Sequence, residues 1–151
     1  MVWGCMGWNG VGILSEVEGK MDSNQCVNIL QEGLVEIIQK LEVPEEKVIF
    51  QQDNDPKHTS KLASNWFERQ GIPLLDWPAQ SPDLNPIEHL WNLLKRRING
   101  YEMPASGVWE LWERAEVEWG KLRPEVCQKL IETIPRRLEA VIKAKGGHTK
   151  Y

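Results

Sequence analysis

The sequence has few cysteines and no long apolar run. Cys5, Cys26 and Cys127 are far apart and form neither a metal-ligand spacing nor a disulfide framework. No apolar run approaches the roughly 20 residues that span a bilayer. The first residues also lack the basic, apolar and cleavage-site segments of a signal peptide. We therefore expect an intracellular protein in a reducing compartment, with no secretory signal and no membrane partner.

An excess of positive charge is also lacking, because the formal net charge is -4. The chain as a whole is therefore not typical of a nucleic-acid binder. The charge is uneven, however: residues 1–50 hold three lysines and eight acidic residues, whereas residues 123–151 hold seven basic residues and three glutamates. The basic C-terminal segment could meet an acidic partner, or it could be a solvated helix face.

Size and composition are ordinary for one globular domain. The chain has 151 residues, of which 41% are hydrophobic and 26% are charged. Eight tryptophans are unusual for this length, and each can bury a large area. No internal repeat or low-complexity tract interrupts the sequence, so a single core is feasible.

Hydrophobic patterning predicts strands first and helices afterwards. Asn9-Gly10 is a hairpin signal between two β-prone segments, 2–8 and 11–17. The alternation that follows favours a mixed α/β domain with helices packed against a sheet. Short strands are predicted at 47–52 and 73–77, and helices at about 22–41, 59–70, 85–99, 105–121 and 124–145, the last interrupted by Pro135. Leu62, Trp66 and Phe67 are expected to face inward from the second helix, and the fourth helix carries Val108, Trp112, Ala115 and Trp119.

Asp53 is the first candidate for chemistry. It follows the predicted strand at 47–52, within the stretch QQDNDPKHTS. Open α/β sheets place functional groups at the carboxyl ends of their strands. The sequence Asp53-Asn54-Asp55-Pro56 is equally good turn chemistry without any metal.

Glu88 is the second candidate, in the first turn of the predicted helix that Asn85 caps and Pro86 begins. Carboxylates fixed on rigid elements can share Mg²⁺ or Mn²⁺, and two such ions roughly 3.5–4 Å apart support phosphodiester chemistry. Glu88 could instead complete a capping box with Asn85. Residue chemistry alone leaves both alternatives open.

Two long motifs carry a resemblance. QQDNDPKHTS and LLDWPAQSPDLNPIEHLW resemble the catalytic domain of Tc/mariner superfamily transposases, and the 34 residues between Asp53 and Glu88 match the spacing of the Tc-like branch. The opening VWGCMGWNGVG and the closing IPRRLEAVIKAKGGHTKY extend the resemblance over essentially the whole chain. The resemblance implies a ribonuclease H-like α/β fold, a mixed sheet with flanking helices, here lacking the first strands and ending in a helical C-terminal half.

The resemblance also implies roles for individual residues. Asp53 matches the family's second catalytic aspartate and Glu88 its third carboxylate, and both would bind Mg²⁺ or Mn²⁺. His58 would contact DNA phosphate or the groups behind the metal ligands, or it is a structural histidine of the loop. The supporting motif positions are Asn54, Pro56, Asp83, Asn85 and Pro86.

The implied partner is DNA, both the transposon ends and the target. Lys95, Arg96 and Arg97 extend the helix that carries Glu88, and they could contact phosphates or merely keep that surface soluble. A homodimer is a further candidate assembly, and the resemblance places the protein in the nucleus.

The match departs from the family in one respect. The family's first catalytic aspartate lies on a strand upstream of the segment that begins here at Met1. The family's helix-turn-helix DNA-binding region also lies upstream of that segment. We therefore expect residues 1–151 to be a partial catalytic domain with little or no strand-transfer activity of its own. The alternative is a decayed or domesticated module that binds DNA or protein without catalysis.

Overall fold

The computed structural model describes residues 1–79, 81–147 and 149. It divides the chain into two compact units, each with a core of its own. The first unit holds Met1–Gly4 and Ser15–Ser81, and the second holds Cys5–Leu14 and Pro82–Tyr151.

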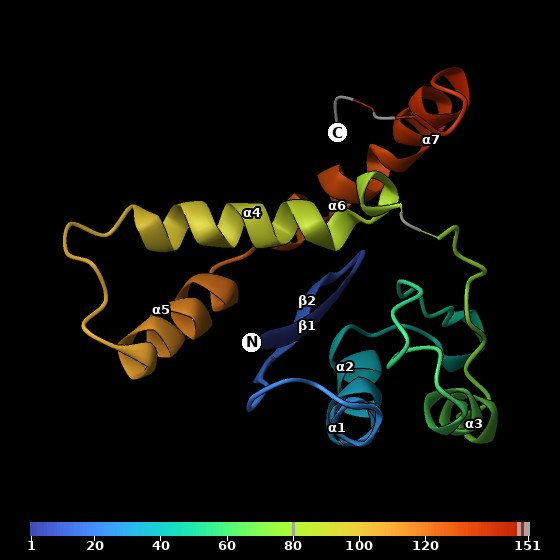
Figure 1. The fold of residues 1–151 in the computed structure, drawn as a ribbon, viewed down its shortest axis with the longest axis horizontal. Helices are drawn as coiled ribbons and strands as arrows, with labels where there is room; N and C mark the ends of the chain where they lie inside the picture. Colours follow the sequence, from blue (N-terminus) through green and yellow to red (C-terminus); the bar gives the residue numbers. More distant parts are fainter. Residues whose placement is uncertain (80, 148, 150–151) are drawn as a thin grey trace. The chain divides into compact units, whose positions relative to one another are not determined.

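The predicted hairpin is confirmed. Strands β1 (Val2–Gly7) and β2 (Gly10–Glu16) form a two-stranded sheet, drawn in blue in Figure 1. Gly10 follows the turn with a φ of 132°, a conformation that L side chains rarely adopt, which explains the glycine of the Asn-Gly pair. The residues at the base of the hairpin count with the first unit and those at its tip with the second.

One interrupted helix replaces the single helix predicted at 22–41. Asp22 caps the N-terminal part: its Oδ1 accepts from the backbone N–H of Gln25 at 2.9 Å, and Gln25 Oε1 accepts from the backbone N–H of Asp22 at 3.3 Å. This reciprocal pair is a capping box. The helical run consists of α1 (Ser23–Ile29), a π-helical segment (Leu30–Leu34) and α2 (Val35–Lys40).

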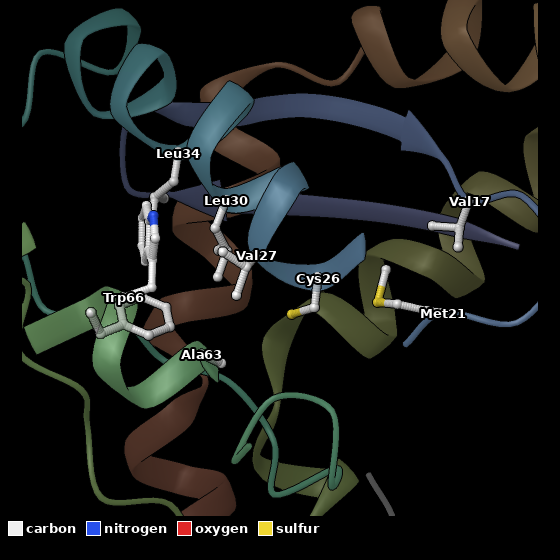
Figure 2. Packing of buried hydrophobic residues seen from close by; sticks show 9 residues of the cluster. Val17, Met21, Cys26, Val27, Leu30, Leu34, Ala63 and Trp66 are labelled. Carbon is white, nitrogen blue, oxygen red and sulfur yellow. The ribbon is translucent and has the colours of Figure 1, made fainter. Parts of the chain in front are cut away.

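The core of the first unit forms where this run meets α3 (Lys61–Gln70). Figure 2 shows Trp66 beside Leu34, with Val27 and Leu30 turned toward α3. Ser60 caps α3 and Gly71 ends it in the left-handed region, close to the bounds of 59–70 predicted for this helix. Leu62, expected to face inward, is instead 44% exposed.

The prediction of short strands at 47–52 and 73–77 is wrong. A 3₁₀ turn occupies Glu45–Lys47, and the two segments share only an isolated parallel bridge between Phe50 and Leu74. Phe50 donates to the Pro73 carbonyl at 2.9 Å and accepts from Leu75 at 2.8 Å. Pro73 has no N–H with which to extend the ladder, which limits the pairing at this point.

The second unit is helical apart from the hairpin tip. Its core is built by Leu90, Leu94, Trp119 and Leu122, and the Trp119 indole donates to the Gly12 carbonyl at 2.9 Å. Its helices are α4 (Pro86–Asn99), α5 (Val108–Gly120), α6 (Pro124–Glu132) and α7 (Ile134–Lys143), with a 3₁₀ turn at Pro82–Leu84.

Two details of this helical half differ from the prediction. Helix α5 begins at Val108 rather than near residue 105, and Val108 is 71% exposed at its first position. The break before the last helix lies at Thr133, and Pro135 falls inside the first turn of α7, where its missing N–H costs no helical hydrogen bond. None of the helices described is long and apolar enough to cross a bilayer.

Candidate active site

Asp53 lies in an internally bonded loop of the first unit, from Gln51 to Ser60. Its Oδ1 accepts from the backbone N–H of Asp55 at 3.2 Å, which closes an Asx turn. Its side chain is 55% exposed. The turn chemistry that the sequence suggests is therefore real, and it uses one carboxylate oxygen.

His58 contacts the same oxygen. Its Nδ1 is 2.5 Å from Asp53 Oδ1, and its side chain is only 16% exposed. Its carbonyl also accepts from Gln52 Nε2 at 3.1 Å. His58 therefore lies where it can fix Asp53, as expected for a histidine that bonds the loop.

Asp55 and Lys57 complete the loop. Asp55 accepts from the backbone N–H of Lys57 at 3.1 Å, and the Lys57 ammonium lies 2.5 Å from its other oxygen. The hydrogen bond from Lys57 holds the pKa of the Asp55 carboxyl below its ordinary value. Asp55 therefore serves the turn, which is the role expected for it.

Asn54 ties this loop to the segment after the bridge, because its amide donates to the Trp77 carbonyl at 2.7 Å. Pro56 is exposed in the turn that follows. The two motif residues thus shape the loop. Among the contacts of the described residues, none engages Asp53 Oδ2, so this oxygen is available to a ligand.

Glu88 lies in the first turn of α4 in the second unit and is exposed. Asn85 caps the helix, and its Oδ1 accepts from the backbone N–H of Ile87 at 3.4 Å. The backbone N–H of Asn85 donates to the Pro82 carbonyl at 3.0 Å, so the donor that a capping box requires is already used. The capping role considered for Glu88 is not formed, and its carboxylate makes no hydrogen bond or ion pair with the described residues.

The loop before Glu88 is anchored from the end of the chain. The Asp83 carbonyl accepts from Arg137 Nη1 at 3.1 Å, and Asp83 Oδ2 accepts from the Thr149 hydroxyl at 2.7 Å. Arg137 is 2% exposed and also donates from Nε to the Thr133 hydroxyl at 2.7 Å. Asp83 is therefore an anchor of the loop, and Pro86, buried at the start of α4, fixes the helix at its first residue.

Sequence reasoning missed the anchoring role of Arg137 and Thr149. The sequence presents Arg137 only as one of the basic residues of the C-terminal segment, and no local spacing links it to Asp83, which lies 54 residues away. Next to Glu88, the burial of His89 lowers the pKa of its imidazole, and the nearby Arg137 guanidinium adds to that effect.

The three basic residues on α4 differ in their surroundings. Lys95 and Arg96 are exposed. Arg97 is partly buried: its Nη1 donates to the Glu118 carbonyl at 3.3 Å and lies 3.7 Å from Glu118 Oε2. Glu118 also accepts from Lys121 and Tyr101, so Arg97 belongs to a polar network that joins α4 to α5.

The structure thus places the predicted residues in two groups. Asp53, Asn54, Pro56 and His58 belong to the first unit, and Asp83, Asn85, Pro86, Glu88 and the basic residues of α4 belong to the second. Within the described part of the chain, no group of three or more His, Cys, Asp or Glu side chains could hold a metal ion. The free oxygens of Asp53 and Glu88 are nevertheless the ligand type that Mg²⁺ and Mn²⁺ prefer, so both residues fit as partial ligands.

Comparison with known proteins gives a consistent family. The model of the DDE superfamily endonuclease domain matches residues 2–106. The Tcb1 transposase of Caenorhabditis briggsae and the Tc1 transposase of Caenorhabditis elegans are 45% and 44% identical over all 151 residues of the chain, which correspond to 54% of each relative. The chain therefore spans about half the length of the curated relatives that it matches.

Solved structures show the fold. The Mos1 transposase catalytic domain with Raltegravir and Mg is similar to this chain with a TM-score of 0.83 and 22% identity. The match covers 99% of this chain and 75% of the Mos1 chain. The Mos1 mariner paired end complex with Mn gives a TM-score of 0.82 at 22% identity over 99% of this chain and 44% of that chain. The predicted ribonuclease H-like fold is confirmed by this likeness.

Proposed function

The chain belongs to the DDE superfamily endonuclease family, and from that membership we propose that it forms part of the catalytic domain of a cut-and-paste DNA transposase. The Tcb1 and Tc1 relatives are transposases, and the solved relatives include Mos1 complexes with Mg, with Mn and with transposon ends. Residues 1–151 would then be a partial ribonuclease H-like domain that acts on DNA in the nucleus, in a homodimer or with further copies.

Asp53 and Glu88 are the proposed metal ligands. The observation that carries this assignment is that each keeps carboxylate oxygen outside the contacts of its own loop. When bound, Mg²⁺ or Mn²⁺ would supply Lewis acidity and lower the pKa of a water that attacks the phosphodiester. Asp53 and Glu88 would hold the cations, and the positive charge of those cations would offset the negative charge that develops on the phosphate.

These two residues are two of the three carboxylates that the family uses. The resemblance implies a first aspartate on a strand that residues 1–151 do not include, so we propose that residues 1–151 alone have little strand-transfer activity. Robust Mg²⁺-dependent nicking of transposon-end DNA by the purified chain would contradict this.

Lys95 and Arg96 are the proposed phosphate contacts. Both are exposed on the helix that carries Glu88, whereas Arg97 is held by Glu118. Removing one phosphate-binding side chain should reduce the salt dependence of DNA affinity by about one unit of logarithmic slope. A filter-binding salt series with Lys95→Ala, Arg96→Ala and Arg97→Ala tests this, and equal slopes for all three variants and the unmodified chain would remove the assignment.

A non-catalytic interaction module is the second candidate function. It is favoured by large apolar side chains displayed around the start of α5: Met103, Val108 and Trp109 are 72%, 71% and 80% exposed. A group of exposed apolar side chains that includes a tryptophan and a methionine is typical of protein interfaces.

A chimera separates the two functions. Residues 1–151 would replace the matching 54% of the Tc1 transposase, and excision of a Tc1 element would be measured in cells. The catalytic proposal expects excision that Asp53→Asn and Glu88→Gln abolish, while the exposed carboxylates changed in Asp76→Asn and Glu113→Gln serve as matched controls. A stable chimera that never excises the element would favour the interaction module, and excision that survives Asp53→Asn would exclude Asp53 as a ligand.

A further inference from the structure

The contacts of Asp53 are one-sided. Oδ1 lies 2.5 Å from His58 Nδ1 and 3.2 Å from the backbone nitrogen of Asp55. Oδ2 takes part in no hydrogen bond or ion pair with the described residues. A carboxylate whose two oxygens are treated so differently has a defined orientation, because rotation about its last bond would break both contacts to Oδ1.

His58 is itself held on both sides. Its backbone N–H donates to the Asp55 carbonyl at 2.9 Å, and its carbonyl accepts from Gln52 Nε2 at 3.1 Å. Its ring is mostly shielded, with 16% of the side chain exposed, while the carboxylate that it contacts is 55% exposed. The more rigid and less exposed partner therefore orients the freer one.

We propose that His58 is a positioning residue: through Nδ1 it fixes the Asp53 carboxylate by Oδ1 and leaves Oδ2 as the oxygen presented to a divalent cation. This inference rests on the proposed function, in which Asp53 is a metal ligand. Side chains behind a metal ligand fix its orientation before the metal arrives, and losing such a partner typically weakens metal affinity about 10- to 100-fold. The main role proposed for His58 is therefore to position Asp53, and no longer to contact a DNA phosphate.

The atom that makes the contact gives a specific test. Asparagine places an amide nitrogen near the position of a histidine Nδ1, whereas glutamine reaches toward the position of Nε2. The affinity of the purified chain for Mn²⁺ would be measured from the free Mn²⁺ signal in electron paramagnetic resonance. We expect His58→Ala and His58→Gln to weaken Mn²⁺ binding by about 10- to 100-fold, and His58→Asn to restore most of the loss.

Controls separate this role from a general loss of structure. His89→Ala removes the histidine of α4 and should leave Mn²⁺ affinity unchanged. Circular dichroism and thermal unfolding of each variant test whether the chain folds. If His58→Asn and His58→Gln bind Mn²⁺ equally, or if His58→Ala binds it as tightly as the unmodified chain, the positioning role is wrong.

The outcome for Asp53 distinguishes this failure from failure of the proposed function. If Asp53→Asn binds Mn²⁺ as the unmodified chain does, or if the unmodified chain does not bind it, the metal assignment fails. The hydrogen bond is then decided separately by long-range ¹H–¹⁵N correlation spectra of the imidazole at one fixed pH. The Nδ1 resonance of His58 should move in Asp53→Asn and stay in place in Asp76→Asn, and an unmoved resonance would overturn the hydrogen bond itself.

Discussion

The loop that carries Asp53 and the loop that precedes Glu88 are held in place in different ways. In the first loop, the bonds that join Gln52, Asp53, Asp55, Lys57 and His58 to one another span six residues or fewer. One longer bond, from Asn54 to Trp77, spans 23 residues. This site is therefore built almost entirely by its own sequence.

The second loop depends on distant residues. Asp83 is bound by Arg137 and Thr149, which lie 54 and 66 residues further along the chain. The bond from Arg137 requires α7 to lie against the 3₁₀ turn at Pro82–Leu84, and closing such long loops costs more conformational entropy than closing a turn. We therefore expect the two carboxylates to respond to different mutations. Substitutions close in sequence should displace Asp53, whereas substitutions near the end of the chain should displace Glu88.

Arg137→Ala should have the largest effect on stability. It removes a buried guanidinium and leaves the Asp83 carbonyl and the Thr133 hydroxyl without their donor, so we expect unfolding to become easier by about 3 kcal/mol. Urea denaturation followed by circular dichroism measures the change. Arg136→Ala, one position away and exposed, is the matched control and should change stability by less than about 0.5 kcal/mol. Equal effects of the two substitutions would show that the anchor does not hold the loop.

Thr149→Val should have a smaller effect of the same kind. Valine keeps the shape of threonine and removes the hydroxyl that donates to Asp83, so we expect the free energy of unfolding to fall by about 1 kcal/mol. A double-mutant cycle with Asp83→Asn isolates the pair. A coupling near zero would place the anchoring of this loop in Arg137 alone.

The same difference explains what could be predicted from the sequence. The hairpin at Asn9-Gly10, the caps at Asp22, Ser60 and Asn85, and the Asx turn at Asp53 were predictable, because each depends on residues a few positions apart. Asp53 and Glu88 were identified in the same way, from the residues of the two family motifs and the spacing between them.

Features that depend on tertiary packing were not predictable. The burial of Arg137 requires α7 to lie against the 3₁₀ turn at Pro82–Leu84, and nothing local distinguishes it from the exposed Arg136. Arg97 similarly differs from Arg96 only because Glu118 on α5 reaches it. The apolar segments around Phe50 and Leu74 looked like strands, but their pairing is limited to a single bridge.

Asn54→Ala tests the one longer link of the first loop. The Asn54 amide is exposed, so losing its bond to the Trp77 carbonyl should cost no more than about 1 kcal/mol. Backbone amide shifts should change within residues 51–60 and around Trp77, and not on α4. Asp76→Ala is the control: it changes a side chain next to Trp77 and keeps the bond from Asn54, so it should leave the amide shifts of residues 51–60 unchanged. Shifts that spread to the residues around Asp83 would contradict the independence of the two loops.

Ser106→Ala has the smallest expected effect on stability and tests whether local construction also occurs in the second unit. Ser106 donates to Glu110 through both its backbone N–H, at 2.7 Å, and its hydroxyl, at 2.6 Å, and Arg114 also pairs with this carboxylate. The bonds from Ser106, followed by that from Arg114, lower the pKa of Glu110 to about 2.

Because the folded pKa of Glu110 lies below the usual value of about 4.3, its contribution to stability is present above that value and is lost as the pH falls toward 2. Ser106→Ala should raise the folded pKa toward the usual value, which removes part of this acid-dependent contribution. Carboxyl ¹³C titration by NMR measures the shift, and Ser64→Ala on α3 is the control that should leave it unchanged. A pKa that stays near 2 in Ser106→Ala would assign the effect to the backbone N–H of Ser106 and to Arg114. A rise would show that the short-range bond from the Ser106 hydroxyl holds this carboxylate in its charged form.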